Sequence, residues 1–212
     1  MTSIDSLLVH LFAALAPGAT APEDDAEVLR LVGRARQGDR SAGEALYRLH
    51  VRRVFRAVRP LCRSEQETEE VVQESFVRAL AGLGGYRPRP GSRFVSWLMT
   101  IAANVARRRS RWFRRAVYDC PAPEVSHELQ PDELLDSQRR RAALLEALAT
   151  LAPRDREVVS MRYGSDLSCA EVAEATGLSE VNVRKICERQ RRKLLELLEA
   201  KLGAAETAGR SA

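Results

Sequence analysis

Apolar residues along most of the chain recur every three or four positions, which is the spacing of one face of an α-helix. No run of alternating apolar and polar residues bounded by turn residues indicates a strand. Three Ser-x-x-Glu patterns, beginning at Ser41, Ser64 and Ser168, precede apolar-periodic runs and predict capping boxes at helix N-termini. Pro60 stops a helix, and Pro153 occupies a first helical turn. The pattern predicts helices over residues 25–37, 42–58, 65–82, 93–116, 133–150, 153–162, 169–175 and 180–200.

A basic segment followed by an acidic segment separates the first four long helices from the later ones. Residues 107–115 carry six arginines, whereas residues 119–136 carry six acidic residues, three prolines and no basic residue. Prolines keep such an acidic segment extended. The sequence therefore predicts an all-α protein of two small helical domains. Its expected parts are an N-terminal extension at 1–24, a helical domain at 25–118 (domain one), an acidic flexible linker at 119–133, a second helical domain at 134–202 (domain two) and a flexible tail at 203–212.

The N-terminal extension contains an apolar stretch that is too short to span a bilayer, and no basic residue precedes it. We therefore expect no signal peptide, no membrane insertion and a cytoplasmic protein. The apolar residues share one helical stripe, which predicts an appended amphipathic helix. They are Ile4, Leu8, Leu11, Phe12 and Leu15.

Composition narrows the classes of function. The chain has 34 basic and 29 acidic residues and a formal net charge of +5, which favours a polyanionic partner only weakly. Its four cysteines form no C-x-x-C pair and its three histidines are scattered, so we expect no metal site and no cofactor. A redox-sensing role for the cysteines remains open. Since no Walker loop, nucleophile elbow or paired-carboxylate pocket is present, we do not expect an enzyme.

Residues 169–188 have the pattern of a helix-turn-helix. Ala173 provides a small side chain where two helices cross, and Gly177 follows where the turn needs a left-handed backbone. The second helix is expected to enter a major groove, and residues 179–193 sum to a charge of +4. The alternative is that the basic residues after residue 190 only form a solvent-exposed face of the helix and do not contact DNA. The candidate DNA contacts are Ser179, Glu180, Asn182, Arg184, Lys185, Glu188 and Arg189.

A second candidate nucleic-acid surface lies between residues 86 and 111. Tyr86 lies in a proline-rich loop between arginines, where its ring could stack on an unpaired base. Asn104 interrupts an apolar helix just before an arginine run, and its amide can read a base edge. The alternative assigns the apolar stripe of this helix to the core, as we expect for Leu98, Ile101 and Val105.

Four stretches in order resemble bacterial RNA polymerase sigma factors of the extracytoplasmic-function (ECF) group of the sigma-70 family. They are DAEVLRLVGRARQGDRSAGEALYRLH (25–50), ETEEVVQESFVRAL (67–80), RFVSWLMTIAANVARRR (93–109) and LAPRDREVVSMRYGSDLSCAEVAEATGLSEVNVRKICERQRRKL (151–194). Two features depart from the family pattern. The loop between Tyr86 and Ser92 is about two residues longer, and V-N-V-R-K-I replaces the usual G-T-V-K-S-R in the recognition helix.

The resemblance implies a promoter-specificity subunit with three kinds of partner: core RNA polymerase, through its largest-subunit clamp coiled coil and its flap, promoter DNA, and an anti-sigma factor. It implies that domain two reads the −35 element. The alternative is a stand-alone helix-turn-helix regulator that binds duplex DNA as a dimer. The implied polymerase-binding residues are Glu69, Glu70, Val71, Gln73, Glu74 and Phe76. The implied −10 element contacts are Tyr86, Arg93, Trp97, Asn104, Arg107, Arg108, Arg109 and Arg111.

Overall fold

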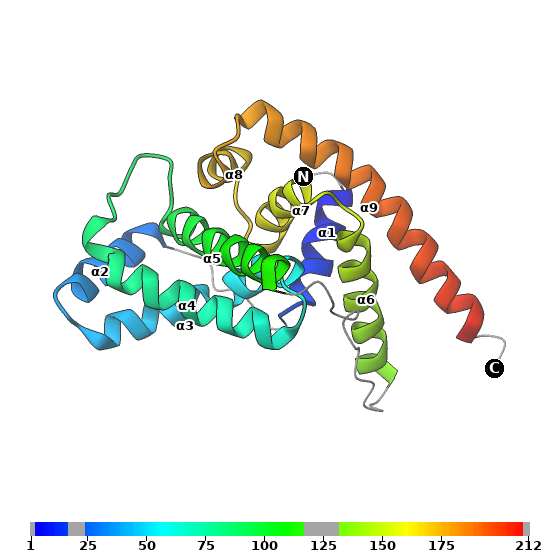
Figure 1. Ribbon diagram of the computed structural model, residues 1–212, viewed down its shortest axis with the longest axis horizontal. Helices are drawn as coiled ribbons and strands as arrows, with labels where there is room; N and C mark the ends of the chain where they lie inside the picture. Colours follow the sequence, from blue (N-terminus) through cyan, green and yellow to red (C-terminus); the bar gives the residue numbers. More distant parts are fainter. Residues whose placement is uncertain (1–2, 17–23, 117–131, 210–212) are drawn as a thin grey trace.

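The computed structural model describes residues 3–16, 24–116 and 132–209, with side chains described for 8–16, 24–110 and 137–201. Regular secondary structure in these ranges is helical (Figure 1), which confirms the predicted all-α fold. The helices are α1 (Ser3–Ala13), α2 (Asp25–Arg36), α3 (Arg40–Val58), α4 (Glu65–Gly82), α5 (Phe94–Ala116), α6 (Asp132–Ala149), α7 (Pro153–Val159), α8 (Cys169–Thr176) and α9 (Glu180–Gly209). Two 3-10 turns, η1 (Arg59–Leu61) and η2 (Leu83–Gly85), follow α3 and α4, and a π-helical segment, η3 (Ser160–Gly164), follows α7. Most of the predicted acidic linker lies outside the described residues.

Domain one consists of α2 to α5, and domain two of α6 to α9 (Figure 1). In domain one, Leu46 of α3, Val72 of α4 and Leu98 of α5 are buried where the three helices meet. In domain two, α8 and the start of α9 form the predicted helix-turn-helix, and α6 packs along the later turns of α9. The spacing of apolar residues therefore predicted the positions of these helices and of core residues such as Leu98.

The two domains pack against each other through one continuous apolar cluster. Met161, Leu167 and Val172 of domain two are buried in the same cluster as the core of domain one. The closest approach joins η3 to α3, where a Cβ added to Gly164 would lie 2.9 Å from the Cα and N atoms of Ala57. The two backbones can come this close because glycine has no side chain. The sequence predicted the two domains, but not that they share a core.

The N-terminus of α3 differs from its prediction. Its cap is Asp39 and not Ser41, so the helix begins two residues earlier than expected. The Asp39 carboxylate accepts hydrogen bonds from the backbone N–H groups of Ser41 and Ala42 at 2.9 and 3.2 Å. Hydrogen bonds from the Ser41 hydroxyl and from Arg34 lower the pKa of Asp39 to about 2. Asp39 satisfies two backbone N–H groups of the first turn and so acts as the N-cap two residues before Ser41.

The other predicted caps are present. Ser168 and Glu171 form a reciprocal capping box at the start of α8, whereas at Ser64 only half of the predicted box is present. The Ser64 hydroxyl accepts the backbone N–H of Glu67 at 3.1 Å, but the Glu67 carboxylate accepts the N–H of Arg63 at 2.8 Å. Gly177 adopts the left-handed conformation (φ 71°) that the helix-turn-helix requires. The Ser179 hydroxyl then accepts a hydrogen bond from the backbone N–H of Asn182 at 3.3 Å. Local side-chain chemistry therefore fixes both ends of the turn between α8 and α9.

The N-terminal extension forms the predicted helix, and the C-terminal segment forms more helix than expected. The predicted amphipathic helix is α1, and Leu8, Leu11, Phe12 and Leu15 of its predicted stripe are buried, while the side chain of Ile4 lies outside the described residues. Helix α9 runs to Gly209, through most of the predicted tail at 203–212, so the expected helix end at residue 200 is wrong. The segment after 200 is rich in alanine and contains no proline, so nothing in it stops the helix.

We expect Gly164→Ala to lower the free energy of unfolding by about 1–3 kcal/mol, because the added methyl group overlaps the α3 backbone. Gly33→Ala is the matched control, since no atom lies within 4 Å of its added Cβ. The control should leave stability unchanged or raise it slightly. Urea unfolding followed by circular dichroism measures both variants, and equal stability of the two would contradict the close packing of η3 on α3.

Candidate polymerase and nucleic-acid interfaces

The solvent-facing side of α4 carries the acidic and amide residues predicted to bind polymerase. Glu69, Glu70 and Gln73 are exposed and Glu74 is half-buried. Glu70 forms an ion pair with Arg109 of α5 at 2.7 Å, and Glu74 forms one within α4 at 2.6 Å. The helix therefore presents negative charge and an amide along one face.

The two apolar residues predicted for this surface lie inward. Val71 is fully buried, so its side chain cannot be reached by a partner in this arrangement, whereas Phe76, 4% exposed, lines a cavity of about 450 Å³. The apolar groups that do reach solvent are Val77 and Leu80 of α4 and Tyr47 of α3, exposed by 62, 40 and 41%. These three line the same cavity. Positions 73, 77 and 80 share one helical face, so the 3.6-residue period could have identified Val77 and Leu80.

Several predicted −10 contacts lie together on α5. Asn104 and Arg108 are exposed, and Arg107 and Arg109 are half-buried. The Asn104 side-chain oxygen accepts a hydrogen bond from the Arg107 guanidinium at 2.8 Å, as expected for residues one turn apart. The side chain of Arg111 lies outside the described residues. An exposed amide is thus held beside a row of guanidinium groups.

Tyr86 differs from the sequence-based expectation because its ring is only 4% exposed. It packs edge-on against Phe94, with ring centroids 5.4 Å apart, and against Trp97 at 5.1 Å. In this arrangement the three aromatic rings form a cluster at the base of the loop, and the Tyr86 ring is not available for stacking. The loop borders a cavity of about 260 Å³ that reaches Arg93 and Glu171.

Two arginines at this loop are held by domain two. Arg93 donates hydrogen bonds to both carboxylate oxygens of Glu171, at 2.8 and 3.0 Å, and to the carbonyl of Asp166 at 2.9 Å. Arg89 forms an ion pair with Glu174 at 2.9 Å. Burial alone would raise the pKa of Glu171, but the hydrogen bonds from Arg93 and from its own cap hold that pKa below its ordinary value. The carboxylate is therefore stabilised in its charged form.

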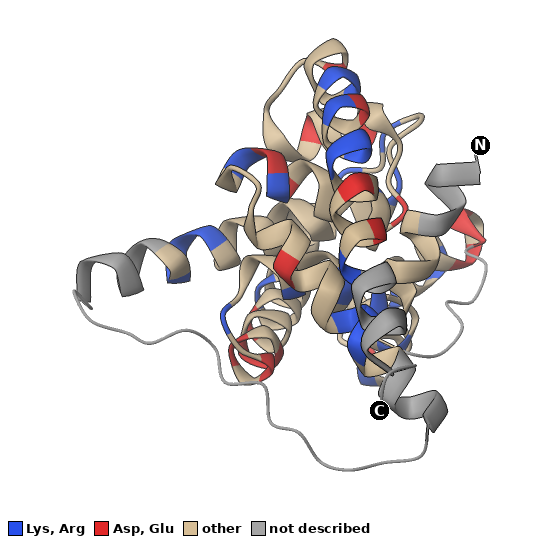
Figure 2. Cartoon of the chain, turned by 90° about the vertical axis from the view of Figure 1, so that its right-hand side faces the viewer, with Lys and Arg blue, Asp and Glu red and all other residues tan. Residues whose placement is uncertain are grey.

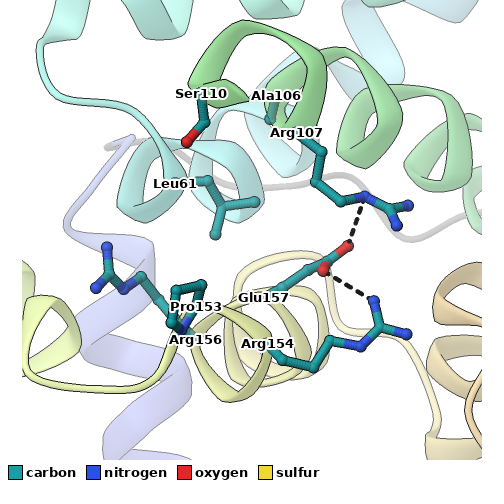
Figure 3. A pocket seen from close by; sticks show the side chains of 8 residues that line it. All are labelled: Leu61, Ala106, Arg107, Ser110, Pro153, Arg154, Arg156 and Glu157. Atoms are coloured by element: carbon teal, nitrogen blue, oxygen red, sulfur yellow. Dashed lines mark hydrogen bonds and ion pairs between the residues drawn. The ribbon is translucent and has the colours of Figure 1, made fainter. Parts of the chain in front are cut away.

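A third contact between the domains surrounds Glu157 (Figure 3). Its carboxylate, 4% exposed, lies between Arg154 of α7 at 3.1 Å and Arg107 of α5 at 3.4 Å. These residues line a cavity of about 430 Å³ between α5 and α7. Two guanidinium groups offset the cost of burying one carboxylate. Arg107, a candidate DNA contact, therefore already forms an ion pair with Glu157 in this arrangement.

The recognition helix presents its predicted residues to solvent in the first turns of α9. Asn182 and Lys185 are exposed, while Arg184 pairs with Glu180 at 2.5 Å and Arg189 pairs with Asp155 at 2.6 Å. Ser179 and Glu188 are exposed as well, and Glu180 is half-buried. Both basic and acidic residues occur along the described helices (Figure 2).

The cysteines are free where the structure describes them, at Cys62, Cys169 and Cys187. Burial raises the pKa of the Cys62 thiol to about 12. A thiol with this pKa stays protonated at neutral pH and is a poor nucleophile. Cys62 is therefore not suited to redox sensing in this arrangement.

Each of the two domains contains a segment that matches a known protein family. Residues 46–116 match the sigma-70 region 2 family model, and residues 141–194 match the sigma-70 region 4 family model. The chain is 31% identical over 181 residues to the ECF RNA polymerase sigma factor BldN of Streptomyces coelicolor, covering 84% of this chain and 68% of BldN. It is 34% identical over 167 residues to the RNA polymerase sigma factor CarQ of Myxococcus xanthus, covering 78% of this chain and 94% of CarQ.

The chain belongs to the ECF group of the sigma-70 family. This ECF sigma factor carries region 2 in domain one and region 4 in domain two, which excludes the alternative of a stand-alone helix-turn-helix regulator. Helix α1 lies outside both matched segments. The resemblance identified from the sequence is confirmed.

Solved structures show the same fold. The sigma factor is similar to CnrH, solved in complex with the cytosolic domain of CnrY, with a TM-score of 0.59 and 26% identity over 80% of this chain and 96% of that one. It also shares the fold of RpoE of Bartonella quintana, solved with the anti-sigma factor NepR, with a TM-score of 0.51 and 22% identity over 82% of this chain and 94% of that one. None of the described helices is both long and apolar enough to cross a membrane.

We expect Glu171→Gln to lower the free energy of unfolding by about 1–3 kcal/mol at pH 7, because the buried Arg93 pair and the α8 cap both lose their charge. Since the folded pKa of Glu171 lies below its ordinary value, the stabilisation is present above that ordinary value and is lost as the pH falls through the folded pKa. The gap between wild type and variant should therefore narrow on acidification.

Urea unfolding at pH values from 7 down to about 3 measures this gap. Glu174→Gln is the control, because its ion pair with Arg89 is exposed and should contribute less than about 1 kcal/mol. A difference between wild type and Glu171→Gln that does not vary with pH would contradict the assignment of the stabilisation to the Glu171 carboxylate.

Proposed function

We propose that this sigma factor binds core RNA polymerase and directs it to promoters, opening the −10 element through region 2 and reading the −35 element through region 4. One observation carries the proposal: regions 2 and 4 occur in order, and each exposes side chains suited to its own target. The sigma factor supplies recognition and DNA melting, while polymerase supplies the chemistry, so no catalytic residue is assigned. We place it in the cytoplasm, where transcription occurs.

The face of α4 suits a basic, amphipathic partner. Its carboxylates at Glu69 and Glu70 provide negative charge, and the neighbouring cavity with Val77 and Leu80 provides apolar contact area. We assign this face to the clamp coiled coil of the largest polymerase subunit. Apolar side chains rimmed by charge are typical of an interface in which burial gives affinity and charge gives orientation.

The start of melting is assigned to α5 and the preceding loop. Asn104 is exposed and oriented by Arg107, so its amide can hydrogen-bond the edge of an unpaired base, while Arg108 faces the phosphates. The cavity beside the loop lies where an extruded base would enter. Extruding a base costs a few kcal/mol, and contacts in such a pocket offset that cost.

Promoter binding requires the two regions to separate. Arg93 and Arg107 pair with Glu171 and Glu157 of region 4, so these arginines cannot contact phosphates until the carboxylates leave. The closed arrangement is therefore the form of the free protein, and polymerase binding favours the open form. RpoE of Bartonella quintana, which shares the fold, was solved in complex with the anti-sigma factor NepR, and this supports an anti-sigma partner for this chain.

In the open form, α9 enters the major groove of the −35 element. Asn182, Lys185 and Glu188 face outward from its first turns and can contact base edges. Arg184 and Arg189 contact the backbone. This division assigns sequence specificity to three side chains of one exposed helical face.

Run-off transcription with the full chain, core polymerase and promoter DNA selected by the reconstituted holoenzyme tests the function. We expect transcripts from specific start sites only when the sigma factor is present. Binding to core without promoter-specific transcripts would overturn the proposal.

We expect Asn104→Ala to reduce promoter opening at least tenfold while core binding stays within twofold of wild type, because Asn104 is assigned to the unpaired base and not to polymerase. Permanganate reactivity of unpaired thymines measures opening, and co-sedimentation measures core binding. Equal losses in both would contradict the assignment.

Reversal of charge at Glu69 and Glu70 to lysine should weaken core association at least tenfold, because it places positive charge against a basic partner. Glu27→Lys on α2 is the control, since this exposed carboxylate belongs neither to the α4 face nor to the candidate DNA contacts. Competition for core polymerase against a labelled wild-type chain gives both affinities. Unchanged binding of the double variant would exclude α4 as the interface.

A further inference from the structure

The first turn of the recognition helix exposes an apolar side chain that has no part in the contacts described above. Val181 is 60% exposed, and it is the one large apolar side chain in the described part of region 4 that mostly faces solvent. It directly follows Glu180, the first residue of α9, at a position where the helix departs from the family pattern. Helix formation does not favour a valine here, because β-branched residues are weaker helix formers than alanine.

Val181 lies at the centre of the outward face of α9. Val183 and Gln190 are buried, and they mark the inward face of the helix. Val181 precedes Val183 by two positions, which is about 200° around the helix, so the two side chains point in opposite directions. Lys185 and Glu188 follow Val181 by four and seven positions, and both are exposed on the same face. The apolar side chain therefore has the same orientation as two candidate base contacts.

The side chains around Val181 are polar or charged. Ser179, Asn182 and Arg184 lie within one turn of it and are exposed. A protein partner that binds by apolar burial needs a contiguous apolar surface, and a single valine among polar groups does not provide one. The arrangement suits a ligand that presents one small apolar group among hydrogen-bonding groups.

The major groove of duplex DNA presents such a group at thymine. Its C5-methyl is the apolar group among the base edges, and apolar side chains recognise thymine through it. The N-terminal residues of a recognition helix are the ones that contact base edges. Because the side chain of Val181 has no hydrogen-bonding group, contact with this methyl is the base information that it can read.

We propose that Val181 is a specificity-determining residue that packs on the methyl group of one thymine in the −35 element. The assignment rests on the proposed function and adds a fourth side chain to the three that contact base edges. Asn182, Lys185 and Glu188 select hydrogen-bond donors and acceptors, whereas Val181 selects a methyl group at one further position of the same element.

Deoxyuridine scanning tests this contact, because uracil keeps the hydrogen-bonding edge of thymine and lacks only the methyl group. The full chain with core polymerase is assayed on promoter DNA selected by the reconstituted holoenzyme, with each −35 thymine of either strand replaced in turn. In competition against unmodified DNA, we expect one replacement to weaken binding of the wild-type holoenzyme about three- to tenfold. The same replacement should change the binding of Val181→Ala by less than about 1.5-fold, because the contact is already lost.

The substitution Val181→Ala leaves folding intact, since it lies on an exposed face and alanine favours the helix. Glu199→Ala, an exposed change on a later turn of α9, is the matched control and should respond to uracil as wild type does. Equal responses of wild type and Val181→Ala, no response at any −35 thymine, or a selected −35 element without thymine would overturn the proposal. Absence of specific binding to unmodified DNA by the wild-type holoenzyme would overturn the proposed function, and this assignment with it.

Discussion

The contact between η3 and α3 is the constraint on which the closed arrangement depends. A residue with a side chain at Gly164 could not lie against the Ala57 backbone, and without that approach the apolar residues around Met161 and Leu167 would lose their cover from region 2. The preceding residue, Tyr163, faces the other way and packs on Phe12 of α1. Two adjacent residues thus connect region 4 to region 2 on one side and to the N-terminal helix on the other.

Electrostatics gives this apolar contact its specificity. Glu157 and Glu171 are almost fully buried, and each is neutralised by an arginine of region 2 that also belongs to the candidate DNA surface. Carboxylates that are paired in this way resist burial less than unpaired ones, but each ion pair must be exchanged for water or phosphate when the domains part. The same arginines pair with carboxylates of region 4 in the structure and, in the function we propose, contact promoter phosphates, so the two contacts exclude each other.

Local sequence signals predicted much of the fold. Apolar periodicity located the α-helices that the structure describes, and the chemistry of Ser168, Gly177 and Ser179 fixed the helix-turn-helix, because caps and turns depend on neighbouring residues alone. Burial was harder to predict. Val71 and Tyr86 face the core because of helices that are distant in sequence, and nothing local distinguishes them from exposed residues of the same type. The packing of the two domains could not be predicted from the sequence for the same reason, because it depends on a contact between Gly164 and α3, which lies about a hundred residues earlier in the chain.

The length of α9 gives region 4 a property that its individual contacts do not suggest. Its 30 residues form one helix of about 45 Å, with recognition residues near one end and the contacts with α6 and α1 some four turns further along. Because α9 is one continuous helix, a rotation about its contacts with α6 and α1 moves the recognition residues as a rigid body. A tilt of about 10° about these contacts moves Asn182 by about 3.5 Å, which is one base-pair step of duplex DNA. A small change in the angle between α9 and α6 would therefore become a shift of about one base pair at the recognition residues.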